Sequence, residues 1–287
     1  MNSKSIATFV CIAIVCANGA AADERTEHSS SQQTLRFAAA GRTLDVRTIQ
    51  GAIAVEAYDG RDVEMLVKKS IRADTQEDLR LAEREVTLDT SDDATVMRAI
   101  ARYPDQPTCG ERSERWHSWP ERRYDVRYDF TIRVPRETRL ELCTINDGDI
   151  IVQGARGDFA IRNVNGRITM MDVSGSGQAT TVNGPVIATF VSAPRAASVF
   201  KTINGHVIVT MPDGLAADLR MKTFNGGLYT DFDVQALPSA ALVKAERRDG
   251  LFVYRSGGFT TVRAGGGGPE LTLETLNGDV RVLKRAK

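Results

Sequence analysis

A four-residue pattern, Thr-x-Asn-Gly, recurs through the second half of this 287-residue chain and limits its possible folds more than any other feature. The copies, one with Asn for Thr and one with an extra Asp, lie at residues 144–148, 163–166, 181–184, 202–205, 223–226 and 275–278. Alternating apolar residues, typical of a half-buried β-strand, follow each copy. One motif at near-constant spacing predicts a repeat architecture in which each copy builds the same unit.

The spacing of the copies is about 20 residues, except that 52 residues separate Asn225 from Asn277. This gap has room for one or two degenerate copies, of which residues 255–258 are the best candidate. A weaker early copy, Thr48-Ile49-Gln50-Gly51, precedes the series.

Two backbone geometries fit these units. Asn-Gly is the usual two-residue hairpin turn, which would give an antiparallel β meander. Alternatively, each unit is one coil of a β-solenoid, with equivalent positions stacked about 4.8 Å apart. Stacking explains why Thr accompanies Asn-Gly, because equivalent residues would meet in hydrogen-bonded ladders of Thr on Thr and Asn on Asn. We therefore predict an all-β fold of the β-solenoid (parallel β-helix-like) type, with the meander as its rival.

The motif also predicts a structural ladder of turns at one corner of the stack. Glycine suits such a turn because it adopts positive φ at little cost. The predicted ladder residues are Asn146, Asn165, Asn183, Asn204, Asn225, Asn277, Gly166, Gly184, Gly205, Gly226 and Gly278.

The residue before each Asn of the motif is apolar, and strict alternation places it on the face opposite Thr and Asn. These residues are Ile145, Val164, Val182, Ile203, Phe224 and Leu276. Stacking would align them in an apolar stripe, and a bare stripe on a monomer marks an interface. The alternative is that the chain bends at each corner and turns them into the core.

The first 22 residues have the features of a secretory signal sequence. Residues 6–17 are almost wholly apolar, and Ala20-Ala21-Ala22 offers small residues at the cleavage position. Because a membrane-spanning helix needs about 20 apolar residues, we expect cleavage rather than anchoring. No later segment is long and apolar enough to span a membrane. The expected mature protein is exported, in the periplasm, outside the cell or on its surface, and begins with a flexible segment, residues 23–33.

The rest of the chain divides into two parts. Residues 34–134 form an N-terminal β-rich part, in which Thr75-Gln76-Glu77-Asp78 has the spacing of a capping box and opens a short charged helix through residues 79–85. A loop rich in Trp and Arg follows at 101–123. Residues 135–287 form the repeat part.

Two cysteines remain after signal cleavage, Cys109 and Cys143. Exported proteins fold in oxidising compartments, so we predict a disulfide rather than two buried free thiols. Closing a loop of about 35 residues stabilises the fold by roughly 3–4 kcal/mol in the chain-entropy model.

The chain resembles the family of β-repeat proteins called putative adhesins (DUF4097 type). Leu140-Glu141-Leu142-Cys143-Thr144-Ile145-Asn146-Asp147-Gly148 and the serial Thr-x-Asn-Gly units resemble its core, and residues 48–55 with Tyr58-Asp59-Gly60 resemble its opening. The resemblance covers about residues 34–285. It implies an exported β-repeat protein and carries over no catalytic residue.

Composition and motifs exclude several functions. Lys and Arg together number 37, as do Asp and Glu, so no basic field would collect nucleic acid. The 3 His lie far apart, and no zinc, phosphate-loop or nucleophile motif occurs. The Asn-Asp-Gly-Asp run at 146–149 lacks the spacing of a calcium loop. We predict no metal and no cofactor.

One segment stands out as a candidate ligand site. Both Trp residues lie in it among several Arg residues, and planar aromatics beside guanidinium groups suit sugars or anionic head groups. The candidates are Trp116, Trp119, Arg112, Arg115, Arg122 and Arg123. The alternative is a loop whose Trp residues cover one edge of the sheet.

Two hypotheses on function follow. The first is a non-enzymatic envelope protein, a binding, adhesion-like or structural module whose partner is an envelope glycan, a lipid head group or another envelope protein. The second is a carbohydrate-active hydrolase or lyase on a β-solenoid. The second requires a cleft with two or more convergent carboxylates, or with a pair of one basic and one acidic residue of perturbed pKa.

Overall fold

In the computed structural model the fold is all-β with one helix. The structure describes residues 8–10, 27–38, 41–104, 106–110, 123–237, 244–248, 251–255 and 258–286. The predicted signal sequence, apart from residues 8–10, and the predicted ligand residues other than Arg123 lie outside these ranges.

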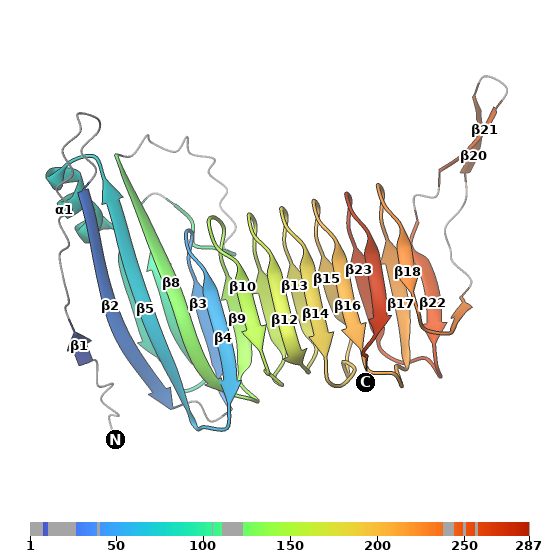
Figure 1. Ribbon diagram of the computed structural model, residues 1–287, viewed down its shortest axis with the longest axis horizontal. Helices are drawn as coiled ribbons and strands as arrows, with labels where there is room; N and C mark the ends of the chain where they lie inside the picture. The colour runs from blue at the N-terminus through green and yellow to red at the C-terminus, as the bar shows by residue number, and fades with distance from the viewer. Residues whose placement is uncertain are drawn as a thin grey trace.

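Two large sheets of eleven strands each make up the body, which is elongated along the direction of stacking (Figure 1). We call them sheet A and sheet B. Sheet A has the order β1 (Thr8–Val10), β2 (Glu27–Ala38), β5 (Asp62–Ala73), β8 (Tyr124–Pro135), β4 (Ile53–Tyr58), β10 (Ile150–Gln153), β12 (Ile168–Val173), β14 (Val186–Phe190), β16 (Val207–Met211), β24 (Val280–Lys284) and β18 (Leu228–Thr230).

Sheet B has the order β19 (Val234–Ala236), β22 (Thr260–Ala264), β17 (Ala217–Lys222), β23 (Glu270–Glu274), β15 (Ser198–Lys201), β13 (Gly177–Thr180), β11 (Phe159–Arg162), β9 (Arg139–Cys143), β3 (Thr43–Arg47), β7 (Val96–Arg102) and β6 (Thr87–Asp92). A hairpin of β20 (Lys244–Arg248) and β21 (Leu251–Arg255) forms a separate two-stranded sheet.

Each repeat unit contributes one strand to sheet B and, after its Thr-x-Asn-Gly corner, one strand to sheet A. We call such a unit a rung; β13 and β14, joined by corner 181–184, are one example. Within both sheets, strands from neighbouring rungs run parallel, as in β12–β14–β16 and β11–β13–β15. A meander would pair them antiparallel. The antiparallel pairs lie near the ends of the stack, including β2–β5–β8 and β17–β22–β19, so both sheets are mixed.

The order of the rungs differs from their order in the chain at both ends. The C-terminal rung β23/β24 lies between β15/β16 and β17/β18. Asn225 and Asn277 are therefore direct neighbours, and residues 226–276 place no further rung between them among the described residues. The predicted degenerate copy at 255–258 lies partly outside those residues; Arg255 ends β21. At the other end, β3/β4 lies between β7/β8 and β9/β10.

The core is the layer between the two sheets. Inward residues alternate along each strand, as in β14 and β16, whose first, third and fifth residues are buried. Phe159, Phe190 and Phe200 form an aromatic cluster with ring centroids 5.8–6.4 Å apart. Since a fully buried aliphatic or Phe side chain contributes about 1.5–3 kcal/mol, this layer supplies the main stabilisation of the stack.

The helix α1 (Gln76–Glu85) confirms the predicted helix and begins three residues earlier than the predicted charged stretch. Thr75 is its N-cap, and the Thr75 Oγ1 accepts a hydrogen bond of 3.1 Å from the Asp78 N–H. Leu79 and Ala82 are buried, and the helix packs on β2, β5 and β8 at the N-terminal end of the stack (Figure 1).

Candidate binding surfaces

The Asn side chains of the corners form one continuous chain of amide hydrogen bonds. Each Nδ2 donates to the Oδ1 of the preceding rung, at 2.6–2.7 Å. The donor–acceptor pairs are Asn165 to Asn146, Asn183 to Asn165, Asn204 to Asn183, Asn277 to Asn204 and Asn225 to Asn277. All the amides point the same way, so the ladder has a donor side and an acceptor side.

The residue at the first position of each motif forms a different contact from the expected one. Its side chain donates to the carbonyl of the motif's Gly in the preceding rung, not to the next Thr. The pairs are Thr144 to Gly51, Thr181 to Gly166, Thr202 to Gly184, Thr275 to Gly205 and Thr223 to Gly278, at 2.7–2.8 Å. Asn163 replaces Thr in its rung and donates from Nδ2 to the Gly148 carbonyl at 2.9 Å. The motif needs a donor at this position rather than a Thr ladder.

The Gly of each corner is required mainly by close packing. Positive φ occurs at Gly184 (149°) and Gly278 (144°), but not at Gly166, Gly205 or Gly226. At all five, a Cβ atom would lie 1.9–2.4 Å from the carbonyl oxygen of a Gly in the neighbouring rung. Such a distance is far inside van der Waals contact, so any side chain here forces the rungs apart.

The six apolar residues before the Asn residues lie on the surface, and we call them the corner stripe. In stacking order they are Ile145, Val164, Val182, Ile203, Leu276 and Phe224. Ile145, Val164 and Val182 are half-buried, whereas Ile203, Leu276 and Phe224 are 38%, 46% and 75% exposed. None is buried, so the alternative that all six turn into the core is wrong. Exposure is greatest at the C-terminal end.

The outer face of sheet A differs from that of sheet B across the same rungs. The outward residues of β10, β12, β14 and β16 that alternate with the buried ones are Ile151, Gln153, Thr169, Met171, Ile187, Thr189, Ile208 and Thr210. None of them is charged, and Ile151, Thr169, Ile187 and Ile208 are in register. We call these eight residues the neutral face. Asp172 is also exposed, at the irregularity near the end of β12, and its carboxylate pairs with Arg285 at 2.7 Å. The outward residues of the sheet B partners include Arg139, Glu141, Arg162 and Lys201.

The residue directly after the Gly of each motif lies between the corner stripe and the neutral face. In three rungs its side chain accepts a hydrogen bond from the next rung: the Asp149 carboxylate from the Arg167 N–H at 2.9 Å, His206 Nδ1 from the Asp279 N–H at 2.9 Å, and the Asp279 carboxylate from the Gly227 N–H at 3.0 Å. Pro185 and Gly227 occupy this position in two other rungs. The two apolar features are therefore distinct surfaces.

The disulfide predicted between Cys109 and Cys143 is present, with the Cα atoms 5.7 Å apart. It fastens the start of the Trp/Arg-rich loop to the end of β9. Arg123, at the other end of that loop, is exposed, and its carbonyl accepts from the Asp74 N–H at 2.9 Å. Both ends of the loop are thus held at the N-terminal part of the stack.

Tyr103 closes the first rung next to this disulfide. Its hydroxyl donates to the Val126 carbonyl at 3.1 Å and lies 3.4 Å from the Thr48 Oγ1. Burial raises the pKa of Tyr103 to about 12, because the phenolate would lose its hydration there.

The carboxylates with shifted pKa values each contact an Arg side chain. Hydrogen bonds from Arg136, Arg263 and Arg281 lower the pKa values of Asp59, Asp218 and Asp279, in that order. Burial tends to raise the pKa of Asp129, but its hydrogen bonds to Arg127 and the Ala52 N–H outweigh burial and lower it. A general acid requires the opposite shift.

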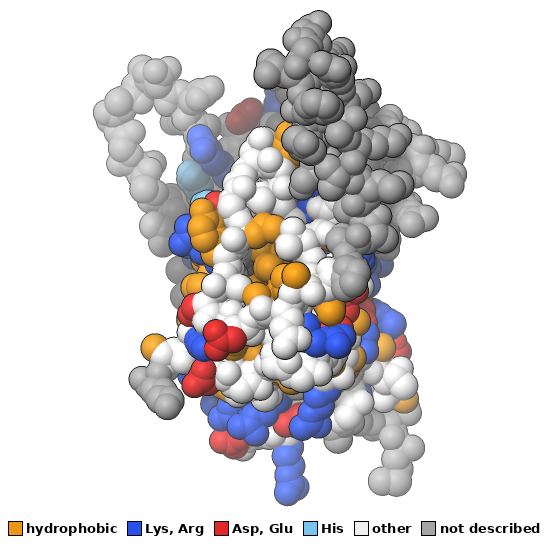
Figure 2. Space-filling model, turned by 90° about the vertical axis from the view of Figure 1, so that its right-hand side faces the viewer, with side chains coloured by type: hydrophobic (Ala, Val, Ile, Leu, Met, Phe, Trp, Pro, Cys, Tyr) orange, Lys and Arg blue, Asp and Glu red, His pale blue; other side chains and the backbone are white. Residues whose placement is uncertain are grey.

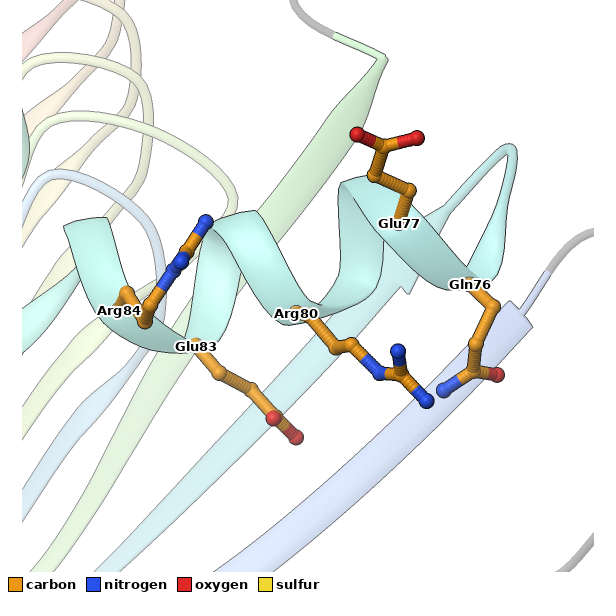
Figure 3. A pocket seen from close by; sticks show the side chains of 5 residues that line it. All are labelled: Gln76, Glu77, Arg80, Glu83 and Arg84. Atoms are coloured by element: carbon orange, nitrogen blue, oxygen red, sulfur yellow. The ribbon is translucent and has the colours of Figure 1, made fainter.

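A shallow depression lies beside α1 at the N-terminal end. Gln76, Glu77, Arg80, Glu83 and Arg84 line it, all from roughly two and a half turns of α1. Figure 3 shows Glu77 pointing away from the side of the helix on which Arg80 and Glu83 lie. Within the described ranges, no three His, Cys, Asp or Glu residues gather as metal ligands. No helix in that part of the chain is long and apolar enough to cross a membrane.

Sequence reasoning missed the neutral face. The face depends on register between rungs that lie about 20 residues apart, which one sequence does not show. A signal was present: Val186-Ile187-Ala188 and Val207-Ile208-Val209 are apolar at three successive positions, so the middle residue is apolar and points outward.

No family model matches the chain, and no curated protein matches it by sequence. The family resemblance noted in the sequence therefore remains an expectation.

Several solved structures resemble the chain at low identity. A "putative cell adhesion protein" from Clostridium sporogenes is 8% identical, with a TM-score of 0.37, and the match covers 90% of this chain and 100% of that one. A "putative adhesin" from Bacteroides fragilis is 9% identical, with a TM-score of 0.37, covering 89% and 97%. A "putative lipid binding protein" from Parabacteroides distasonis is 9% identical, with a TM-score of 0.32, covering 90% and 97%.

Proposed function

We propose that this protein is an exported, non-enzymatic binding or adhesion-like module of the cell envelope, built on a β-solenoid of Thr-x-Asn-Gly rungs. The observation that carries the proposal is the neutral face: eight alternating outward positions on four adjacent strands hold no charge, and the one exposed charge of these strands, Asp172 near the end of β12, is paired with Arg285. In sheet B, β9, β11 and β15 carry outward charges. A flat, uncharged face of this extent favours contact with another surface.

The chemistry of the neutral face suggests the type of partner. Methyl groups of Ile and Thr alternate with Thr hydroxyls and the Gln153 amide. Neutral sugars bind such surfaces through apolar contact and hydroxyl hydrogen bonds, and a neutral protein face does the same. An anionic lipid head group would need Lys or Arg, which the neutral face lacks. An envelope glycan or another envelope protein is therefore the proposed partner of this face.

The Trp/Arg-rich loop is a second proposed contact region. The disulfide at Cys109 holds its start against sheet B. Its predicted ligand residues combine Trp rings with Arg guanidinium groups, which suits an anionic group.

Binding of the mature protein, residues 23–287, to glycan and lipid arrays tests the proposal. In the neutral face, Ile187→Lys with Thr189→Lys should weaken capture of the best ligand at least tenfold, because two desolvated charges would enter the contact. The matched control is Gln178→Lys, an exposed position on β13 of the same rung, and it should change capture less than twofold.

Two results would contradict the proposal. Equal loss in the control would show that the neutral face is not the contact surface. Turnover of an envelope polysaccharide by the pure protein would show that the module is an enzyme, as in the carbohydrate-active alternative.

A further inference from the structure

The two ends of the stack differ in whether their corner groups have partners. At the N-terminal end, the Tyr128 and Phe130 N–H groups of β8 donate to the Gln50 and Ala52 carbonyls at 2.9 Å. At the C-terminal end, β18 is the last strand of sheet A. Figure 2 looks onto this end, where hydrophobic side chains gather in the middle of the described surface.

In the last rung, the two acceptors that the corner of an added strand would use have no partner within the described part of the chain. In the preceding rungs the Gly carbonyl of the motif accepts from the side chain at the first position of the next corner, and the Asn Oδ1 accepts from the next Asn Nδ2. Within the described part of the chain, the Gly226 carbonyl and the Asn225 Oδ1 have no such partner.

The matching donors are also unused. The first residue of every interior sheet A strand donates its N–H to the next rung, as Val186, Val207 and Val280 do at 2.9 Å. The Leu228 N–H is the equivalent group of the last rung, and it points away from β24 because Gly227 on its flank already accepts from Val280. The Gly226 N–H is likewise equivalent to those of Gly184, Gly205 and Gly278, which donate to the next Asn carbonyl.

Apolar surface accompanies these groups. Phe224 of the corner stripe is 75% exposed and Tyr229 of β18 is 51% exposed. Leu228 is only half-buried, although its equivalents Val186, Val207 and Val280 are completely buried. The next rung buries each equivalent, so an added strand would cover Leu228 as well.

We propose that the C-terminal end is a strand-addition site for a partner protein, which docks an extended segment of the type Thr-x-Asn-Gly followed by alternating apolar residues. The segment adds parallel to β18 and continues the ladder of Asn225. Only sheet A and the corner are open, because β22 and β19 already extend sheet B beyond β17. The occupant is therefore one strand with its corner, not a complete rung.

A second copy of this chain would fill the open end only in part. Every described Thr-x-Asn-Gly corner already lies between neighbours in its own stack, except the last one, and the opposite end is closed by antiparallel β2, β5 and β8. Two last rungs meeting about a twofold axis would run antiparallel, which places Asn225 of one away from Asn225 of the other. Such a pair would join backbone groups of the two β18 strands, but it would not supply the donors for the Gly226 carbonyl and the Asn225 Oδ1.

A peptide carrying residues 201–211 of this chain, Lys-Thr-Ile-Asn-Gly-His-Val-Ile-Val-Thr-Met, is the probe. We expect saturable binding of one peptide to the mature protein at peptide concentrations up to about 1 mM. A Gly205→Val peptide should bind at least tenfold more weakly, because its Cβ would meet the Gly226 carbonyl as closely as in the interior corners. A Thr202→Val peptide should lose about fivefold, the value of one net hydrogen bond.

Amide hydrogen exchange by NMR locates the site without any change to the protein. The Gly226 and Leu228 amides should exchange freely in the free protein and slow at least tenfold with the peptide, while Gly205 and Val207 are protected throughout. The proposal fails if the Val peptide binds equally, if no peptide binds, or if protection appears at another edge. The proposal also fails if the Gly226 and Leu228 amides are already protected in the free protein, because this end would then be covered. Sedimentation would show whether a second copy covers it, as a dimer, or the same chain, as a monomer.

This inference extends the proposed binding role, yet its test is separate. Peptide binding depends on Gly226 and Leu228, whereas the array test depends on Ile187 and Thr189. Each of the two proposals can therefore be contradicted without the other.

Discussion

The N-terminal and C-terminal ends of the stack differ in how far their outermost strands are covered by other elements. At the N-terminal end, long antiparallel strands, α1, Tyr103 and the disulfide cover the first rung. At the C-terminal end, sheet B is extended by β22 and β19, but sheet A stops at β18 with its corner groups unfilled. A stack of parallel rungs leaves an open edge at each end unless another element covers it, and exposed edges are templates for further strands. The comparison shows that one end of this protein is terminated and the other can still be extended.

The largest expected effect comes from disrupting the contact between neighbouring rungs in the middle of the stack, between the two ends. Gly205→Val places a side chain where a Cβ would lie 2.2 Å from the Gly184 carbonyl oxygen. We expect a loss of more than about 3 kcal/mol in the free energy of unfolding, measured by urea denaturation, because neighbouring rungs must move apart. Gly214→Val is the matched control, since a Cβ there meets nothing within 4 Å. A similar loss in both variants would contradict close packing as the reason for the Gly.

Removing the disulfide tests the closed end. Cys109→Ala with Cys143→Ala should lower the free energy of unfolding by roughly 3–4 kcal/mol, because the cross-link no longer restricts the unfolded chain. The variant without the disulfide should bind the 201–211 peptide as tightly as the wild type does, because the peptide site lies at the opposite end of the stack. Free-thiol titration of the unfolded, unreduced wild type should find no thiol.

The pH dependence of stability tests the role of Tyr103 at the closed end. Its pKa is raised from 10.0 to about 12 in the folded state, so the neutral side chain contributes fully below pH 10 and that contribution is lost as pH rises towards 12. We expect the free energy of unfolding to fall by up to roughly 2 kcal/mol over this range. Tyr103→Phe should reduce this fall. An equally steep fall in Tyr103→Phe would assign the effect to other groups.

The smallest predicted effect compares equivalent Asn residues in the middle and at the open end. Asn204 donates to Asn183 and accepts from Asn277, whereas Asn225 only donates. Each neutral hydrogen bond contributes about 1 kcal/mol, so Asn204→Ala should cost about 1 kcal/mol more than Asn225→Ala in thermal or urea unfolding. Equal costs would mean that the amide ladder adds nothing beyond each side chain's local contacts.

Much of the local structure could be predicted from the residues. The Thr75 cap and the alternation of Val207-Ile208-Val209 depend on short-range chemistry, which one sequence records directly. The disulfide joins residues 34 positions apart, but it could be predicted because only two cysteines remain after the expected signal cleavage. The separation between Asn225 and Asn277 misled this reasoning, because the long interval was interpreted as room for one or two further rungs, whereas the two Asn residues are direct neighbours.

The sequence by itself determined that the repeats form β-structure with a tight Asn-Gly corner, because those residue types have few other low-energy conformations. Only the tertiary structure decided which rung stacks on which, and it placed residues 270–284 between 198–211 and 217–230. The reason is physical: every corner offers the same donors and acceptors, so local chemistry permits any order of neighbours. The choice depends on chain connections and on the shape of the core, which act over long distances.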